Sequence, residues 1–148
     1  MKLKRVVSPE AAFLMTHLLQ GVFKRGTAAG VAGRINVPVA GKTGTTNDYR
    51  DAWFVGYTPQ LVTAVWVGFD DNRSMRNKNR RGITGGRAAL PIWTAFMNAA
   101  LRGEPDHDFN IPSGIIFENV DPRTGRIVRF SELQSMRVAL RYGTKLAE

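Results

Sequence analysis

The sequence contains no cysteine and only two histidines, His17 and His107. The absence of cysteine excludes disulfide bonds, cysteine-based zinc sites and thiol catalysis. With only two histidines, a histidine-based metal site is also a poor candidate. Long apolar runs are also missing, since the longest, residues 61–69, is far too short to cross a bilayer. No long apolar segment follows the basic start at Met1, so we do not expect these residues to be a secretory signal.

The overall composition is that of a globular protein. Among 148 residues, 43% are hydrophobic and 22% are charged, which excludes a disordered chain, a collagen-like repeat and a coiled coil. The formal net charge of +9 is spread along the chain, and only residues 73–81 form a dense basic segment. We expect a solvated basic surface there, with an anionic polymer, lipid head groups or nucleic acid as the alternative partner.

Two segments show helical periodicity. Ser8 and Pro9 suit the N-cap and first position of a helix whose apolar residues recur up to Phe23, and Gly26 is a plausible stop. Residues 88–101 have the same spacing, with Trp93 on the apolar face.

Strand-like segments lie between the two helices. Residues 35–39, 52–57 and 61–69 predict a three-stranded antiparallel meander, with residues 41–51 as a turn. We expect 61–69 to be the more buried strand, and the three tryptophans to lie in the core. Their positions are Trp53, Trp66 and Trp93.

The C-terminal part predicts a separate hairpin. Residues 114–117 and 126–128 flank the turn signature at 121–125. Residues 131–148 are charged and weakly patterned.

A Gly-Lys-Thr-Gly sequence at residues 41–44 is the main candidate for chemistry. A phosphate-binding loop would need glycine at position 36, where Asn36 stands, and a helix after Lys42, where a turn sequence follows. Penicillin-interacting serine enzymes use Lys-Thr-Gly on a strand instead. The edge of such a strand can pair with an extended peptide, while Lys42 brings a cation and Thr43 a hydroxyl that can hold a carboxylate.

The longer context resembles bifunctional, class A penicillin-binding proteins. Residues 39–59, VAGKTGTTNDYRDAWFVGYTP, closely resemble their K-T-G region, and residues 61–71, LVTAVWVGFDD, the strand that follows it. Residues 85–93, GGRAALPIW, resemble their C-terminal helix. Two further segments, SPEA at 8–11 and GTA at 26–28, resemble the helix and loop that precede the K-T-G strand.

The resemblance implies a D,D-transpeptidase that cross-links peptidoglycan stem peptides through an acyl-serine and is acylated by β-lactams. It implies catalytic roles for Lys42, which stabilises charge and assists proton movement, and for Thr45, whose backbone N–H is an oxyanion-hole donor. Substrate binding falls to Thr43, Gly44 and Thr45, with the threonine hydroxyls on the terminal carboxylate and Gly44 allowing close approach of the backbone. No metal, cofactor or nucleic acid is expected.

The chain departs from the family pattern in its serines. None has lysine three residues later, so S-x-x-K is missing, and none belongs to the second family motif, S-x-N. The serines are Ser8, Ser74, Ser113, Ser131 and Ser135. We therefore expect a C-terminal piece of a longer protein, inactive alone, whose partner is the N-terminal part of the same domain. The resemblance places that protein in the cytoplasmic membrane, with this domain on the periplasmic or outer side.

These observations predict an α+β chain, in which the K-T-G strand and the next two strands pack with helices as part of the β-lactamase/transpeptidase-like fold. Residues 1–102 would belong to the transpeptidase domain and 103–148 to a C-terminal extension with the hairpin. Two alternatives stay open, a serine β-lactamase-like hydrolase and a basic nucleic-acid-binding module.

Overall fold

The computed structural model describes residues 4–31, 33–79, 81–129 and 135–145. The chain divides into two compact units. The larger unit spans Leu18–Phe109 and contains the K-T-G segment. The smaller unit combines Met1–His17 with Asn110–Glu148.

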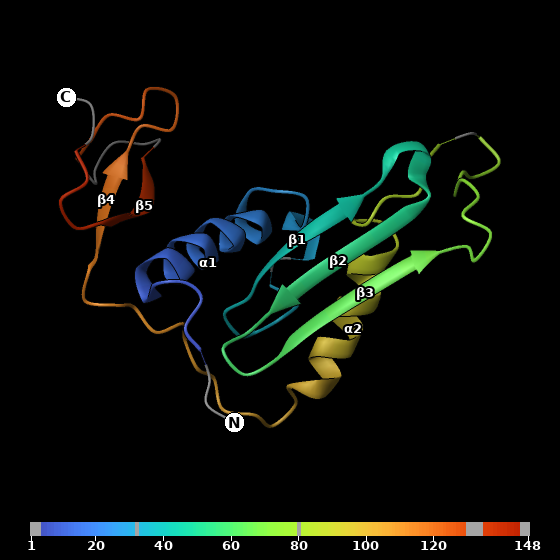
Figure 1. Cartoon of the computed structure of the whole chain (residues 1–148), viewed down its shortest axis with the longest axis horizontal. Helices are drawn as coiled ribbons and strands as arrows, with labels where there is room; N and C mark the ends of the chain where they lie inside the picture. Colours follow the sequence, from blue (N-terminus) through green and yellow to red (C-terminus); the bar gives the residue numbers. More distant parts are fainter. Residues whose placement is uncertain (1–3, 32, 80, 130–134, 146–148) are drawn as a thin grey trace. The chain divides into compact units, whose positions relative to one another are not determined.

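A three-stranded antiparallel sheet forms the centre of the larger unit (Figure 1). Its strands are β1 (Ala40–Thr45), β2 (Asp51–Tyr57) and β3 (Val62–Gly68), in that order across the sheet. Helix α2 (Ala89–Ala100) packs against β2 and β3. The predicted α+β class and this helix are confirmed. The three antiparallel strands also follow one another in the predicted order, but the first of them lies at other residues than predicted.

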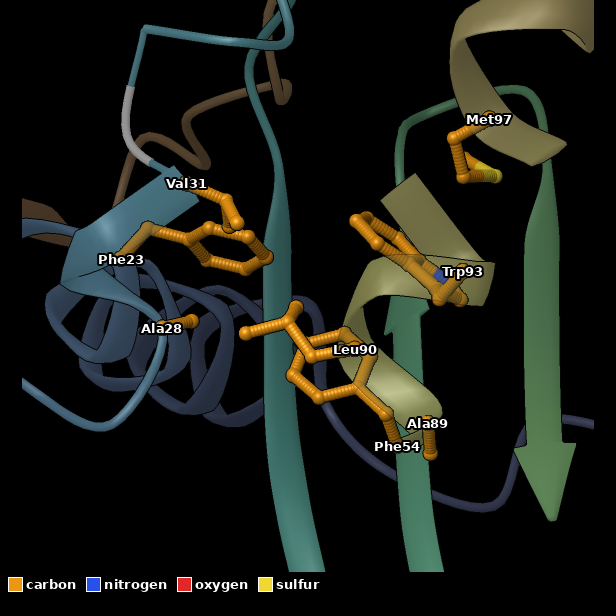
Figure 2. Packing of buried hydrophobic residues seen from close by; sticks show 8 residues of the cluster. All are labelled: Phe23, Ala28, Val31, Phe54, Ala89, Leu90, Trp93 and Met97. Atoms are coloured by element: carbon orange, nitrogen blue, oxygen red, sulfur yellow. The ribbon is translucent and has the colours of Figure 1, made fainter. Parts of the chain in front are cut away.

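One face of the sheet carries the core. Strand β2 alternates, so that Ala52, Phe54 and Gly56 are buried while Trp53 and Val55 are exposed. Buried residues of α2, of the end of α1 (Pro9–Lys24) and of the short helix η1 (Ala29–Val31) cover Phe54 (Figure 2). The cluster consists of Phe23, Ala28, Val31, Phe54, Ala89, Leu90, Trp93 and Met97.

Trp93 packs at the centre of this cluster. Its side chain is fully buried, its ring centroid is 4.9 Å from that of Phe54, and its Nε1–H donates a hydrogen bond to the Thr63 carbonyl at 3.1 Å. A Cβ at position 56 would stand 2.5 Å from the Trp93 ring, so glycine is required on β2 there. Burying a side chain of this size contributes roughly 3 kcal/mol, which makes Trp93 a main anchor of α2 on the sheet.

The first strand lies later in the sequence than its apolar pattern indicated. Residues 35–39 are not a strand, and β1 instead occupies Ala40–Thr45, inside the segment predicted as a turn. Ala40 pairs with Tyr57, the last residue of β2, so residues 35–39 find no partner on that strand. Pro38 also lacks the N–H that a ladder needs. The turn is confined to residues 46–50, around η2 (Asn47–Tyr49).

Two burial predictions for the sheet are wrong. Strand β3 is not the more buried strand, because in the described part of the chain it pairs only with β2 and exposes Val62, Ala64 and Trp66. Trp53 and Trp66 are 41% and 43% exposed, because they lie on the face opposite the core. Only Trp93 is a core tryptophan.

The first predicted helix is confirmed as α1. The Ala11 N–H donates to Ser8 Oγ at 3.2 Å, which is the expected N-cap. The helix ends at Lys24, and a Cβ at Gly26 would lie 2.8 Å from Cα of Val22, so glycine allows the close turn there. Among the described residues, no helix is long and apolar enough to span a membrane.

The smaller unit contains a second antiparallel pair, β4 (Ile115–Val120) with β5 (Met136–Arg141). The predicted hairpin is therefore wrong in its second strand: residues 126–128 form only an isolated bridge, between Val120 and Ile127, while the turn at 121–125 does form. Charge along β5 hid this strand in the sequence. The predicted weakly patterned end includes residues 131–134 and 146–148, which lie outside the described residues.

Candidate active site

The K-T-G motif lies on β1, at one edge of the sheet. One side of this strand pairs with β2, and in the described part of the chain no strand pairs with its other side. The Lys42 side chain is exposed at that strand. The unpaired backbone groups of such an edge can bind an extended peptide as an added strand.

The register distributes the motif over both faces. Lys42 and Gly44 stand opposite Val55 and Trp53, on the exposed face of the sheet. Thr43 stands opposite Phe54, so it lies on the core face. Thr45, opposite Ala52, shares that face.

Lys42 nevertheless reaches Thr43 around the edge of the sheet. Its Nζ donates hydrogen bonds to the Thr43 carbonyl at 2.9 Å and to Thr43 Oγ1 at 3.4 Å. The ammonium is therefore held beside a hydroxyl and in contact with solvent. A fixed cation of this kind stabilises negative charge that develops on a bound molecule.

Thr43 has a second hydroxyl partner that the sequence did not assign to the site. Its Oγ1 lies 3.0 Å from Oγ1 of Thr27, in the loop between α1 and η1. Lys42, Thr43 and Thr27 thus form one hydrogen-bonded chain at the strand edge. The GTA sequence at 26–28 was part of the family resemblance, which was the one available signal for Thr27.

Thr45 makes its hydrogen bond elsewhere. The backbone N–H of Gly85 donates to Thr45 Oγ1 at 3.1 Å. Gly85 itself is buried against the sheet, where a Cβ would stand 2.1 Å from the Trp53 carbonyl oxygen and 2.6 Å from that of Gly44. The structure therefore brings Lys42 and Thr43 together with Thr27. Thr45 is held separately, by its hydrogen bond from the Gly85 N–H.

A closed turn follows the motif. The Thr46 hydroxyl donates to the Asp51 carboxylate at 3.1 Å and accepts from the Asp51 N–H at 2.9 Å. Trp66 Nε1–H donates to the other carboxylate oxygen at 2.9 Å. Asp48 and Tyr49, in the same turn, have φ of 58° and 56°, and the Tyr49 N–H donates to the Thr46 carbonyl at 3.1 Å. These contacts fix the strand end at which the Thr45 backbone N–H lies.

Gly44 contacts the sheet rather than open space. A Cβ there would stand 3.1 Å from Cβ of Trp53, its cross-strand neighbour. The glycine therefore has a packing role in this structure, in addition to the ligand approach that the resemblance implies.

The basic segment 73–81 folds back on the β1–β2 turn. Arg76 lies 3.7 Å from an oxygen of Asp48 and stacks over the Tyr49 ring at 5.0 Å. Arg73 pairs with Asp71 at 3.7 Å and stacks over Phe69 at 3.9 Å. Arg80 lies outside the described residues.

No group of three or more metal-ligating side chains occurs among the residues that the structure describes. A cavity of about 150 Å³ in the larger unit is lined mainly by apolar side chains and contains no residue of the motif. Its lining residues are Gln20, Phe23, Lys24, Val31, Gly33, Ile35 and Val39. The candidate active site is the open edge of β1, which this cavity does not adjoin through any motif residue.

The comparison with known families identifies the domain to which this part of the chain belongs. The family model described as the penicillin binding protein transpeptidase domain matches residues 2–92, which include all of β1, β2 and β3. The chain therefore belongs to the penicillin-binding protein transpeptidase domain family.

Individual relatives with a similar sequence are penicillin-binding proteins 1A. The chain is 43% identical over 123 residues to penicillin-binding protein 1A of Pseudomonas aeruginosa, which covers 83% of this chain and 14% of the relative. It is also 43% identical over 115 residues to penicillin-binding protein 1A of Neisseria gonorrhoeae, covering 78% of this chain and again 14% of the relative. The chain thus spans about one seventh of the length of these relatives.

Solved structures show the same fold. Penicillin-Binding Protein 1A from Haemophilus influenzae superposes with a TM-score of 0.84 at 33% identity, covering 97% of this chain and 22% of that one. The PonA1 protein from Mycobacterium tuberculosis, solved in complex with penicillin V, gives a TM-score of 0.52 at 32% identity over 66% of this chain and 28% of that one.

Proposed function

We propose that the chain supplies the K-T-G strand of the acyl-transfer site of a serine D,D-transpeptidase that cross-links peptidoglycan and is acylated by β-lactams. The observation that carries this proposal is the Lys42 ammonium held on Thr43 at an open strand edge. The family to which the chain belongs, and the penicillin in the complex of a relative, support the same chemistry.

In the proposed reaction, a serine hydroxyl attacks the carbonyl of a D-Ala-D-Ala stem peptide. The serine oxygen bonds to the carbonyl carbon, the peptide bond breaks, and D-alanine leaves with a proton. An amine of a second stem peptide then attacks the ester, takes the acyl group and releases the serine. A β-lactam reacts in the first step, but its opened ring stays on the serine.

The residues of β1 have separate tasks in this scheme. Lys42 places a positive charge beside the reacting centre and assists the movement of the serine proton. The backbone N–H of Thr45 donates to the oxyanion, an interaction worth about 3 kcal/mol in comparable sites. The hydroxyls of Thr43 and Thr45 bind the carboxylate of the substrate, and Gly44 leaves room for its backbone.

The attacking serine has to come from outside these residues, because none of the chain's serines stands in an S-x-x-K sequence. The proposed partner is therefore the part of the transpeptidase domain that carries this motif. The proposal places the complete protein in the cytoplasmic membrane, with this domain on the periplasmic or outer side.

A hybrid protein tests the proposal. The chain's residues replace the matching segment of penicillin-binding protein 1A of P. aeruginosa, over the 123 aligned residues. We expect the hybrid to form a covalent adduct with a reactive penicillin, and the isolated 148-residue chain to show no mass increase. An unreactive hybrid, or a stoichiometric adduct on the isolated chain, would contradict the proposal.

A further inference from the structure

Thr27, in the loop between α1 and η1, is the last member of the hydrogen-bonded chain that begins with Lys42 and Thr43 of β1. The proposed function assigns no role to it. Its Oγ1 lies 3.0 Å from Thr43 Oγ1, and Lys42 Nζ lies 3.4 Å from the same Thr43 oxygen. A hydroxyl has one proton to donate and two lone pairs with which to accept. The two neighbours of Thr43 therefore restrict which way its own proton points.

Lysine can only donate, so one lone pair of Thr43 Oγ1 accepts from Lys42. If Thr27 also donates, both lone pairs are used and the Thr43 proton has to point away from them. If Thr43 donates instead, the Thr27 proton is the one left over. Only the first arrangement leaves Thr43 with a proton that its neighbours direct and that is available to an anion. We therefore take Thr27 as the donor of this hydrogen bond.

Thr27 is held by a rigid part of the fold. The N–H of Gly26 and the N–H of Ala28 both donate to the Val22 carbonyl at 3.1 Å, which closes the loop on both sides of Thr27. Ala28 is fully buried in the core cluster. The Thr27 hydroxyl is therefore positioned before any ligand arrives, which lowers the cost of ordering the site on binding.

We propose that Thr27 is a positioning residue that orients the Thr43 hydroxyl toward the carboxylate of the bound peptide or penicillin. This inference rests on the proposed function, since it concerns how the same site recognises a carboxylate. Thr27 acts through Thr43 and does not take part in the acyl transfer itself.

The test compares a penicillin that has its carboxylate with the methyl ester of the same compound, in the hybrid protein described above. Thr27→Val removes the hydroxyl and keeps the shape, whereas Thr27→Ser keeps the hydroxyl. We expect Thr27→Val to lower the second-order acylation rate for the acid by about 5- to 10-fold, the effect of one hydrogen bond, and to change the rate for the ester much less. Thr27→Ser should keep the ratio of the two rates.

Thr63→Val is the matched control. Its hydroxyl contacts Met97 Sδ at 3.4 Å on the core face of β3, away from the motif, so the ratio should be unchanged. The ratio also cancels any fraction of misfolded protein, because that fraction lowers both rates equally.

Equal slowing of both compounds by Thr27→Val would overturn the inference and assign Thr27 a structural role only. An unchanged rate for both compounds would overturn it as well. These outcomes leave the proposed function intact, since the hybrid is still acylated. An unsubstituted hybrid that is not acylated contradicts the proposed function and this inference together.

Discussion

The backbone N–H of Gly85 donates a hydrogen bond to Oγ1 of Thr45 at 3.1 Å, across a sequence separation of 40 residues. Because this bond uses a lone pair of the hydroxyl, the Thr45 proton stays available for another acceptor. The contact also joins the loop before α2 to the end of β1. Gly85 thus packs against the sheet and also determines which hydrogen bond the hydroxyl of Thr45, a proposed substrate-binding residue, can still make.

The first prediction concerns this glycine. Gly85→Ala places a Cβ 2.1 Å from the Trp53 carbonyl oxygen, which is backbone and cannot move aside cheaply. We expect the free energy of unfolding of the 148-residue chain to fall by about 1–3 kcal/mol, the usual effect of overpacking. Chemical denaturation followed by tryptophan fluorescence measures it.

Gly86→Ala provides the control. Its nearest contacts would be 3.5 Å to the Thr27 carbonyl oxygen and 3.8 Å to Thr43 Cγ2, which are ordinary distances. The same experiment should show a much smaller change there. If Gly85→Ala lowers the free energy of unfolding as little as Gly86→Ala does, the loop adapts to the extra Cβ. The close packing of Gly85 then has no energetic consequence.

Much of the fold could be predicted from local sequence signals. Ser8 with Pro9 marked the start of α1, and the strand-like residues 52–57 indicated β2. Strand β1 could not be found from its apolar pattern, because Gly41 to Thr45 resembles a turn and has few residues that favour strands. Its pairing with β2 makes it a strand, and only the family resemblance indicated that.

The candidate site was predictable in part for the same reason. A continuous motif contains Lys42, Thr43, Gly44 and Thr45, so all four could be named from sequence. Thr27 and Gly85 are 16 and 40 residues away from their hydrogen-bond partners, and no local pattern relates such positions. Packing of the loops against the sheet brings them to the motif.

The second prediction concerns the exposed face of the sheet. Trp53, Val55, Val62 and Trp66 are 41–69% exposed on the side opposite the core. Apolar patches and unpaired strands favour association, so the isolated chain should self-associate with increasing concentration. Val62→Lys puts a charge on an edge strand within the patch and should weaken this association.

Sedimentation velocity over a range of concentrations measures the effect. Ile127→Lys is the control, because Ile127 is 55% exposed but belongs to the smaller unit, outside the patch. It should leave the association constant unchanged. If the chain remains monomeric at all concentrations, the exposed apolar residues of the sheet do not drive association, and the prediction is wrong.

The third prediction is a pH dependence in the turn at 121–125. The Arg123 N–H donates to the Asp121 carboxylate at 2.8 Å, and this bond, more than the nearby Thr124 and guanidinium, lowers the pKa of Asp121. The ionised carboxylate therefore stabilises the turn above the ordinary aspartate pKa, and this contribution is lost as pH falls through the lowered value.

Amide hydrogen exchange of Arg123, corrected for its intrinsic pH dependence, should report this loss. Protection should be constant above the ordinary aspartate pKa and should decrease as pH falls through the lowered pKa of Asp121. Asp121→Asn cannot ionise, so the variant should lack this decrease. The assignment fails if protection in the two proteins follows the same pH course.

The last prediction separates the two groups that the proposed function uses on β1. Lys42→Ala removes the positive charge beside Thr43, where the oxyanion and the serine proton need it. In the hybrid, the acylation rate with penicillin should fall on the order of 10²–10³-fold, as when one electrostatic donor is lost. Thr45→Val removes a hydroxyl but keeps the backbone N–H that serves the oxyanion, so its rate should fall less.

Thr45→Val also leaves the Gly85 N–H without its acceptor, so part of its effect is on stability. Rates are therefore taken per acylatable molecule, from the final adduct yield of each protein. Thr45→Ser keeps both the hydroxyl and the acceptor, and should acylate close to the unsubstituted rate. If Lys42→Ala acylates as fast as the unsubstituted hybrid, Lys42 has no part in the reaction, and the assignment of β1 to the acyl-transfer site is wrong.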